Sequence, residues 1–129
     1  MPPEPFEYAI IRVVPRVERG ERLNVGVVLQ SRRHRFLGAQ LDLDEARLAA
    51  LAALAPDLDL EALRAHLDGI RRIVAGDPSG GPIAALSAPE RFHWLVSPSS
   101  TVIQPSDVHT GLTEDPAAAL EDLFLKLVA

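Results

Sequence analysis

Residues 91–115 carry a high density of side chains that could do chemistry. The segment contains the single tryptophan, two of the four histidines and many hydroxyl and amide groups. Polar groups concentrated on loops are more often functional than those on helices. His93 and His109 could act as an acid/base pair or as metal ligands, because imidazole titrates near neutral pH. Arg91 could hold an anion through two parallel hydrogen bonds.

The spacing of the histidines does not favour a metal site. His93 and His109 match no metal-binding motif, and His34 and His66 fall in a predicted turn and a predicted helix. A zinc site would need further ligands, and the nearby aspartates are not diagnostic. We therefore predict no metal and no cofactor, and a structural or surface role is the alternative for each histidine.

A cluster of hydroxyl groups follows the tryptophan. Ser99, Ser100 and Thr101 could supply a nucleophile, bind a phosphate or receive a phosphoryl group from a kinase. No Gly-x-Ser-x-Gly elbow surrounds them. The glycine-rich residues 76–81 are not a phosphate loop, because they lack the Lys-Ser/Thr ending and follow a helix. The sequence therefore identifies no catalytic residue.

Two further polar side chains lie within predicted strands. Arg12 and Asn24 are on neighbouring strands and could share a face of the sheet with Gln104 and His109, forming a polar pocket. The alternative is a face that is only hydrated, as is common in antiparallel sheets. The candidate binding surface comprises Arg12, Asn24, Arg91, His93, Ser100, Thr101, Gln104, His109 and Thr110.

Three strands that would position the first of these residues are predicted near the start of the chain. Residues 7–15 are rich in β-branched types and end at a proline. Residues 23–30 and 36–43 alternate with a period of two, which predicts one apolar face. The short connections favour an antiparallel meander. Two later strands are predicted at Phe92–Val96 and Thr101–Gln104.

Helical spacing of apolar residues predicts three helices, at residues 44–55, 59–76 and 115–127. Each begins with an aspartate suited to an N-cap, and Gly76 suits the end of the second. Every helix has one apolar stripe and the strands have one apolar face. We therefore expect an α+β fold, an antiparallel sheet with about three helices packed on one face. No linker divides the chain, so residues 1–129 are predicted to form one domain.

Composition restricts the class of protein. The chain has 129 residues, 47% of them apolar, and its net charge of −5 does not suit a nucleic-acid-binding protein. Arg32, Arg33 and Arg35 form a short basic patch that we interpret as solvated surface. The absence of cysteine suits a reducing cytoplasm. We find neither a secretory signal nor a membrane-spanning stretch, and predict a cytoplasmic protein.

Several strings resemble one known family. Residues 8–15 (Tyr-Ala-Ile-Ile-Arg-Val-Val-Pro) and 23–27 (Leu-Asn-Val-Gly-Val) resemble the start of the domain of unknown function 3037 family. Residues 91–95, 100–104 and 108–112 are similar to its other signatures, so the resemblance spans nearly the whole chain. Ser99 stands where an arginine is expected, and any anion contact made by that arginine would be lost.

The resemblance implies a small bacterial protein without an assigned activity. It also implies a gene that neighbours genes for kinases similar to persister-type toxin kinases, and hence a kinase as a possible partner. The first hypothesis is an interaction or regulatory module, since no catalytic motif is present. The alternative is a small enzyme or a nucleotide- or anion-binding protein that uses residues 91–111. That alternative requires Arg91, His93 and His109 to share a pocket of roughly 300 Å³ or more.

Overall fold

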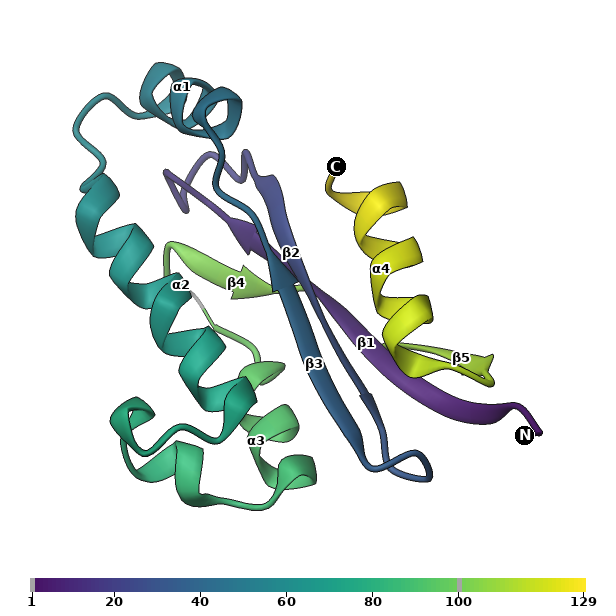
Figure 1. The fold of residues 1–129 in the computed structure, drawn as a ribbon. Helices are drawn as coiled ribbons and strands as arrows, with labels where there is room; N and C mark the ends of the chain where they lie inside the picture. The colour runs from purple at the N-terminus through teal and green to yellow at the C-terminus, as the bar shows by residue number, and fades with distance from the viewer. Residues whose placement is uncertain (1, 100) are drawn as a thin grey trace.

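The computed structural model describes residues 2–99 and 101–129 (Figure 1). Its strands are β1 (Glu4–Val13), β2 (Leu23–Ser31), β3 (Phe36–Leu41), β4 (Ile103–Pro105) and β5 (His109–Thr113). Its α-helices are α1 (Glu45–Leu54), α2 (Leu60–Ala75), α3 (Ala88–Leu95) and α4 (Pro116–Leu127). Two short 3-10 helices, η1 (Pro78–Gly80) and η2 (Pro82–Ala85), connect α2 to α3. The α+β class and the antiparallel meander β1–β2–β3 are confirmed.

Strands β4 and β5 share one edge of β1. The order in the sheet is β3-β2-β1-β4, and β5 also pairs with β1. β5 lies against residues 4–8 and β4 against residues 11–13. Between them, the N–H of Ile10 donates to Ser106 Oγ at 2.8 Å, and the N–H of Ser106 donates to Ile10 O at 2.8 Å. Ser106 therefore keeps the β1 edge hydrogen-bonded where neither strand reaches it.

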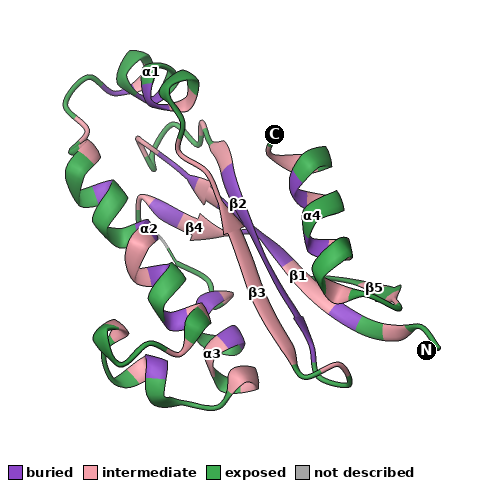
Figure 2. Cartoon of the chain, viewed as in Figure 1, coloured by how far each residue is buried: buried purple, intermediate pink, exposed green. Residues whose placement is uncertain are grey.

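The sheet is covered on both faces. Three helices pack on one face, as expected, but the helix predicted at residues 115–127 is α4 and covers the other face. Helices α1, α2 and α3 pack on one face, while α4 packs on the other (Figure 1). Val25 and Val28 belong to the core beneath α1–α3, whereas Val27 and Leu29 pack against Leu120 of α4. Strand β2 is buried along most of its length for this reason (Figure 2). A strand buried on both faces reads as a continuous apolar run, as residues 25–29 do.

A β-bulge divides the predicted apolar face of β2. Ile11 pairs with Gly26 but Arg12 pairs with Asn24, so Val25 is an extra residue on β2. Because a bulge shifts the alternation by one residue, Val25 faces the α1–α3 layer rather than sharing a face with Val27. Asn24 is thereby placed on the same face as Arg12.

The predicted strand Phe92–Val96 is wrong, because these residues lie mainly in helix α3. Ser87 caps this helix and forms a capping box with Glu90, and these hydrogen bonds lower the pKa of Glu90 below its ordinary value. Phe92 and Leu95, one helical turn apart, are the buried residues of α3. The strand predicted at Thr101–Gln104 is β4, shifted to Ile103–Pro105, and β5 was not predicted.

The three predicted helices with aspartate caps are α1, α2 and α4. Asp44, Asp59 and Asp115 accept hydrogen bonds from backbone N–H groups in the first turns. Gly76 ends α2 in the left-handed conformation at a φ of 69°. Within the described residues, no helix combines the length and apolar character needed to span a membrane.

Candidate functional site

Arg12, Asn24 and Gln104 form a row across three strands. Arg12 pairs with Asn24 on β2 and with Gln104 on β4, and directly opposite residues of an antiparallel sheet point to the same face. Arg12 Nε donates to Asn24 Oδ1 at 3.4 Å. Gln104 Nε2 instead donates to the carbonyl of Thr101 at 2.8 Å. The structure thus brings these three residues together on the face that carries α4.

The row is joined to the end of α4. Asn24 Nδ2 donates to Leu127 O at 3.0 Å, so this side chain stabilises a carbonyl without a partner inside the helix. The pKa of Arg12 is lowered by partial burial and by the charge of Arg22, while Asp107 opposes this effect. The row therefore attaches α4 to the sheet, a structural role.

His109 and Thr110 lie on β5, at the edge of the same sheet. His109 is opposite Tyr8, and the two ring centroids are 5.3 Å apart. Thr110 is opposite Glu7, so its side chain points to the other face. Both residues are exposed. His109 therefore shares a face with Arg12 but lies four residues along β1 from it.

Arg91 holds the end of α2. Its Nη1 donates to Ile73 O at 2.9 Å and to Val74 O at 3.0 Å, which are carbonyls of the last helical turn. A guanidinium in this position satisfies orphan carbonyls and complements the negative end of the helix dipole. The hydrogen bonds of Arg91 therefore go to the backbone, and the anion-binding role expected from the sequence has no support in this geometry.

Replacing Arg91 with methionine is expected to lower the free energy of unfolding by about 2 kcal/mol. Methionine keeps the apolar stem but removes two hydrogen bonds from a charged donor, each worth roughly 1.5–3 kcal/mol, while relieving the buried Nε that lacks a partner. Urea unfolding monitored by circular dichroism measures the change. A loss below about 0.5 kcal/mol would mean that water replaces the guanidinium at these carbonyls.

His93 and Trp94 belong to a different surface, on the outer side of α3. They line a shallow cavity of about 450 Å³ together with Arg32 from the β2–β3 turn. Trp94 is 47% exposed and Leu86 38% exposed. We call this the α3 surface; its residues are Arg32, Leu86, Pro89, Glu90, His93, Trp94 and Ser97. The sequence pointed to His93 and Trp94 but missed Leu86 and Arg32, which only the packing of α3 beside the β2–β3 turn brings together.

Thr101 lines a second cavity, of about 350 Å³, which shares Trp94 and Ser97 with the first. We call this the α3–β4 cavity; its lining residues are Ile11, His66, Ile70, Trp94, Leu95, Ser97, Pro98, Ser99, Thr101, Ile103 and Pro105. His66, which the sequence predicts on a helix and to which it gives no role, comes from α2. Ser100, part of the predicted hydroxyl cluster, lies outside the described residues.

Arg91, His93 and His109 do not converge. His109 is opposite Tyr8, which packs in the layer of α4, whereas His93 belongs to α3 on the opposite face of the sheet. Arg91 contacts the end of α2. The condition set for an enzyme built on these three residues is not met.

Comparison of the sequence with known protein families identifies a match. The family model described as "Protein of unknown function (DUF3037)" matches residues 8–128. No curated protein and no solved structure matches the chain.

Proposed function

The chain belongs to the DUF3037 family, whose description assigns no activity, and on this premise we propose that it is an interaction module. It binds a protein partner through the α3 surface. The observation that carries the proposal is a half-exposed tryptophan beside an exposed leucine and an arginine, all lining one shallow cavity. Tryptophan and arginine are the residues most enriched among those that dominate binding energy.

The apolar part of the α3 surface favours a macromolecular partner. Trp94 and Leu86 keep 47% and 38% of their surface exposed, although Phe92 and Leu95 of the same helix are buried. An exposed apolar patch with a polar rim is typical of a binding site. Covering it removes apolar area from water and so stabilises a complex.

The charge beside the patch favours a partner with an acidic surface. Arg32, Arg33 and Arg35 are exposed in the β2–β3 turn, and none of the three makes an ion pair with another described residue. The chain as a whole has a charge of −5, so this turn is a local positive region. Such a region steers an oppositely charged partner and fixes its orientation. The partner that we propose to test first is the toxin-like kinase implied by the family resemblance.

The test is binding of the purified kinase to the purified chain, measured by co-elution and by calorimetry. We expect a complex, and we expect Trp94→Ala to weaken it by about 30-fold or more, which corresponds to roughly 2 kcal/mol. Leu125→Ala is the matched control, because Leu125 is also an exposed apolar residue of a helix, at 58%, but lies on α4. This control is expected to bind as the unmodified chain does.

Two outcomes separate the parts of the proposal. If the kinase does not bind but another protein co-purifies in a Trp94-dependent manner, the surface stands and the kinase is wrong. If Trp94→Ala and Leu125→Ala bind every partner equally, the α3 surface is not the interface. Raising the salt concentration is expected to slow association in the unmodified chain, and Arg32→Glu is expected to remove part of this effect.

A further inference from the structure

The α3–β4 cavity has the construction of a small-molecule site. Its floor consists of four side chains that are each less than a tenth exposed, Ile11, Ile70, Leu95 and Ile103. Its rim carries Trp94, His66 and three hydroxyl groups. A mostly apolar hollow with a few convergent polar groups is the usual form of a ligand site. Its volume of about 350 Å³ is at the small end of that class, which favours a ligand of one or two rings.

The three described hydroxyl groups of the rim have their protons committed to the protein. Thr101 Oγ1 donates to Ile103 O at 2.9 Å. Ser99 Oγ lies 2.8 Å from Thr101 Oγ1, and because the Thr101 proton is already used, Ser99 is the donor of this pair. Ser97 Oγ donates to His93 O at 2.7 Å. A hydroxyl has one donor and two acceptor lone pairs, so these three hydroxyl groups can offer a ligand only acceptors.

The charge of the lining argues against an ionic ligand. The described residues that line the cavity include no aspartate, glutamate, lysine or arginine, and His66 is the one titratable side chain among them. Transferring an ion into a mostly apolar hollow without a counter-charge is unfavourable. Carboxylates also lack the N–H or O–H donors that hydroxyl groups with committed protons require.

We propose that the α3–β4 cavity binds a small, uncharged, planar ligand that presents N–H or O–H donors. The ring of the ligand lies on the apolar floor beside the Trp94 indole, and its donors meet Ser97, Ser99 and Thr101. This site goes beyond the proposed partner binding, because it takes a small molecule between α3 and β4 and needs no second protein, although the two cavities share Trp94 and Ser97.

Three probes of nearly identical shape test the proposal: benzamide, benzoate and benzamidinium. Benzamide is neutral with N–H donors, benzoate is anionic without them, and benzamidinium is cationic with them. The chain has a single tryptophan, so one indole N–H signal in the ¹H–¹⁵N spectrum of the labelled protein reports on the rim of the cavity. We expect a saturable shift with benzamide and a Kd on the order of 1–10 mM, as ligand efficiency allows for a fragment of this size.

The relative affinities of the three probes support or overturn the proposal. Benzoate is expected to bind at least about tenfold more weakly, because it leaves the hydroxyl lone pairs facing an anion. Absence of a saturable shift with benzamide up to about 50 mM would overturn the proposal, since that is about five times the upper end of the expected Kd. Benzamidinium binding tighter than benzamide would overturn the uncharged class. Equal binding of benzoate would overturn the donor requirement.

A pair of variants tests whether benzamide contacts the hydroxyl groups of the cavity rim. Thr101→Val keeps the shape of the side chain, removes an acceptor, and is expected to weaken benzamide binding about fivefold or more. Thr110→Val makes the same change at an exposed position of β5 and is expected to have no effect. Equal affinity of the two variants would place the ligand elsewhere. Kinase binding by Thr101→Val is expected to be unchanged, so failure of the ligand site and failure of the partner proposal are distinguishable.

Discussion

Replacing Gly26 with alanine is expected to lower the free energy of unfolding by about 3 kcal/mol, because the new Cβ has no space. Gly26 is buried in the central strand β2, between Ile11 of β1 and Leu41 of β3. A Cβ there would overlap the Leu41 side chain and lie 2.8 Å from the carbonyl oxygen of Gln40. The leucine side chain can rotate, but the carbonyl belongs to the strand ladder and cannot move without disturbing the pairing.

Gly69→Ala is the matched control for Gly26→Ala. Gly69 lies inside helix α2, and a Cβ there would meet no atom within 4 Å. Alanine favours a helix by roughly 0.8–1 kcal/mol over glycine, so this variant is expected to be more stable than the unmodified chain. Urea unfolding of both variants measures the contrast. Equal stability of the two would show that β2 and β3 separate easily at Leu41, contrary to their packing.

Much of the fold follows from local patterns in the sequence. The alternation in residues 23–30 and 36–43 predicts β2 and β3 because a pleated strand places every second side chain on one face. The aspartates at the starts of α1, α2 and α4 predict those helices, since each side chain has a free backbone N–H to satisfy. These patterns depend on neighbours in the chain, so they hold whatever the tertiary arrangement.

The wrong predictions have two physical causes. At Phe92–Val96, aromatic and β-branched residues favour a strand, but the capping box of Ser87 and Glu90 starts a helix just before them. That signal is present in the sequence and would have corrected the prediction. The position of α4 on the opposite face of the sheet is different. It depends on Val27 and Leu29 facing away from Val25, which the bulge opposite Arg12 decides.

The candidate site was harder to predict than the fold. The sequence gathered Arg91, His93 and His109 into one segment, yet that segment crosses from α3 to β5 and so passes to the other face of the sheet. Proximity in the chain therefore did not become proximity in space. The sequence suggests that Arg12, Asn24, Gln104 and His109 share a face, but it does not give the strand register, which sets the first three opposite one another and His109 four residues along β1. Leu86 and His66 reach their cavities through helix packing, which no local pattern encodes.

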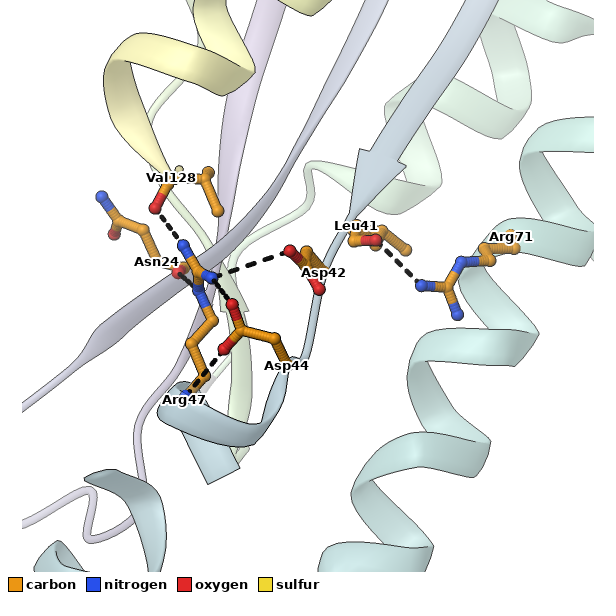
Figure 3. A network of polar contacts seen from close by, with 7 residues as sticks. All are labelled: Asn24, Leu41, Asp42, Asp44, Arg47, Arg71 and Val128. Atoms are coloured by element: carbon orange, nitrogen blue, oxygen red, sulfur yellow. Dashed lines mark hydrogen bonds and ion pairs between the residues drawn. The ribbon is translucent and has the colours of Figure 1, made fainter. Parts of the chain in front are cut away.

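Arg47 joins three parts of the structure that are distant in the sequence (Figure 3). It lies in α1, and its guanidinium donates to Asn24 O of β2 and to Val128 O at the end of α4. It also forms ion pairs with Asp44 at 2.9 Å and Asp42 at 3.7 Å. The Arg47 side chain is only 13% exposed, whereas the two aspartates are about half exposed, at 45% and 44%. The guanidinium is therefore much less exposed to water than the two carboxylates with which it pairs.

Replacing Arg47 with alanine is expected to lower the free energy of unfolding by about 3 kcal/mol, because a largely buried guanidinium loses its hydrogen bonds to two backbone carbonyls, each worth roughly 1.5–3 kcal/mol. The loss leaves Val128 O without its donor, so the last turn of α4 is expected to exchange its amide hydrogens faster than α2 does.

Arg71→Ala is the control. Arg71 is exposed, makes one hydrogen bond to Leu41 O at 3.0 Å, and its loss should cost about 0.5 kcal/mol or less. If Arg47→Ala and Arg71→Ala unfold at the same urea concentration, the contacts of Arg47 add nothing beyond those of a surface arginine. If Arg47→Ala is much less stable but α4 exchanges no faster than α2, the network supports the sheet and α1 rather than the attachment of α4.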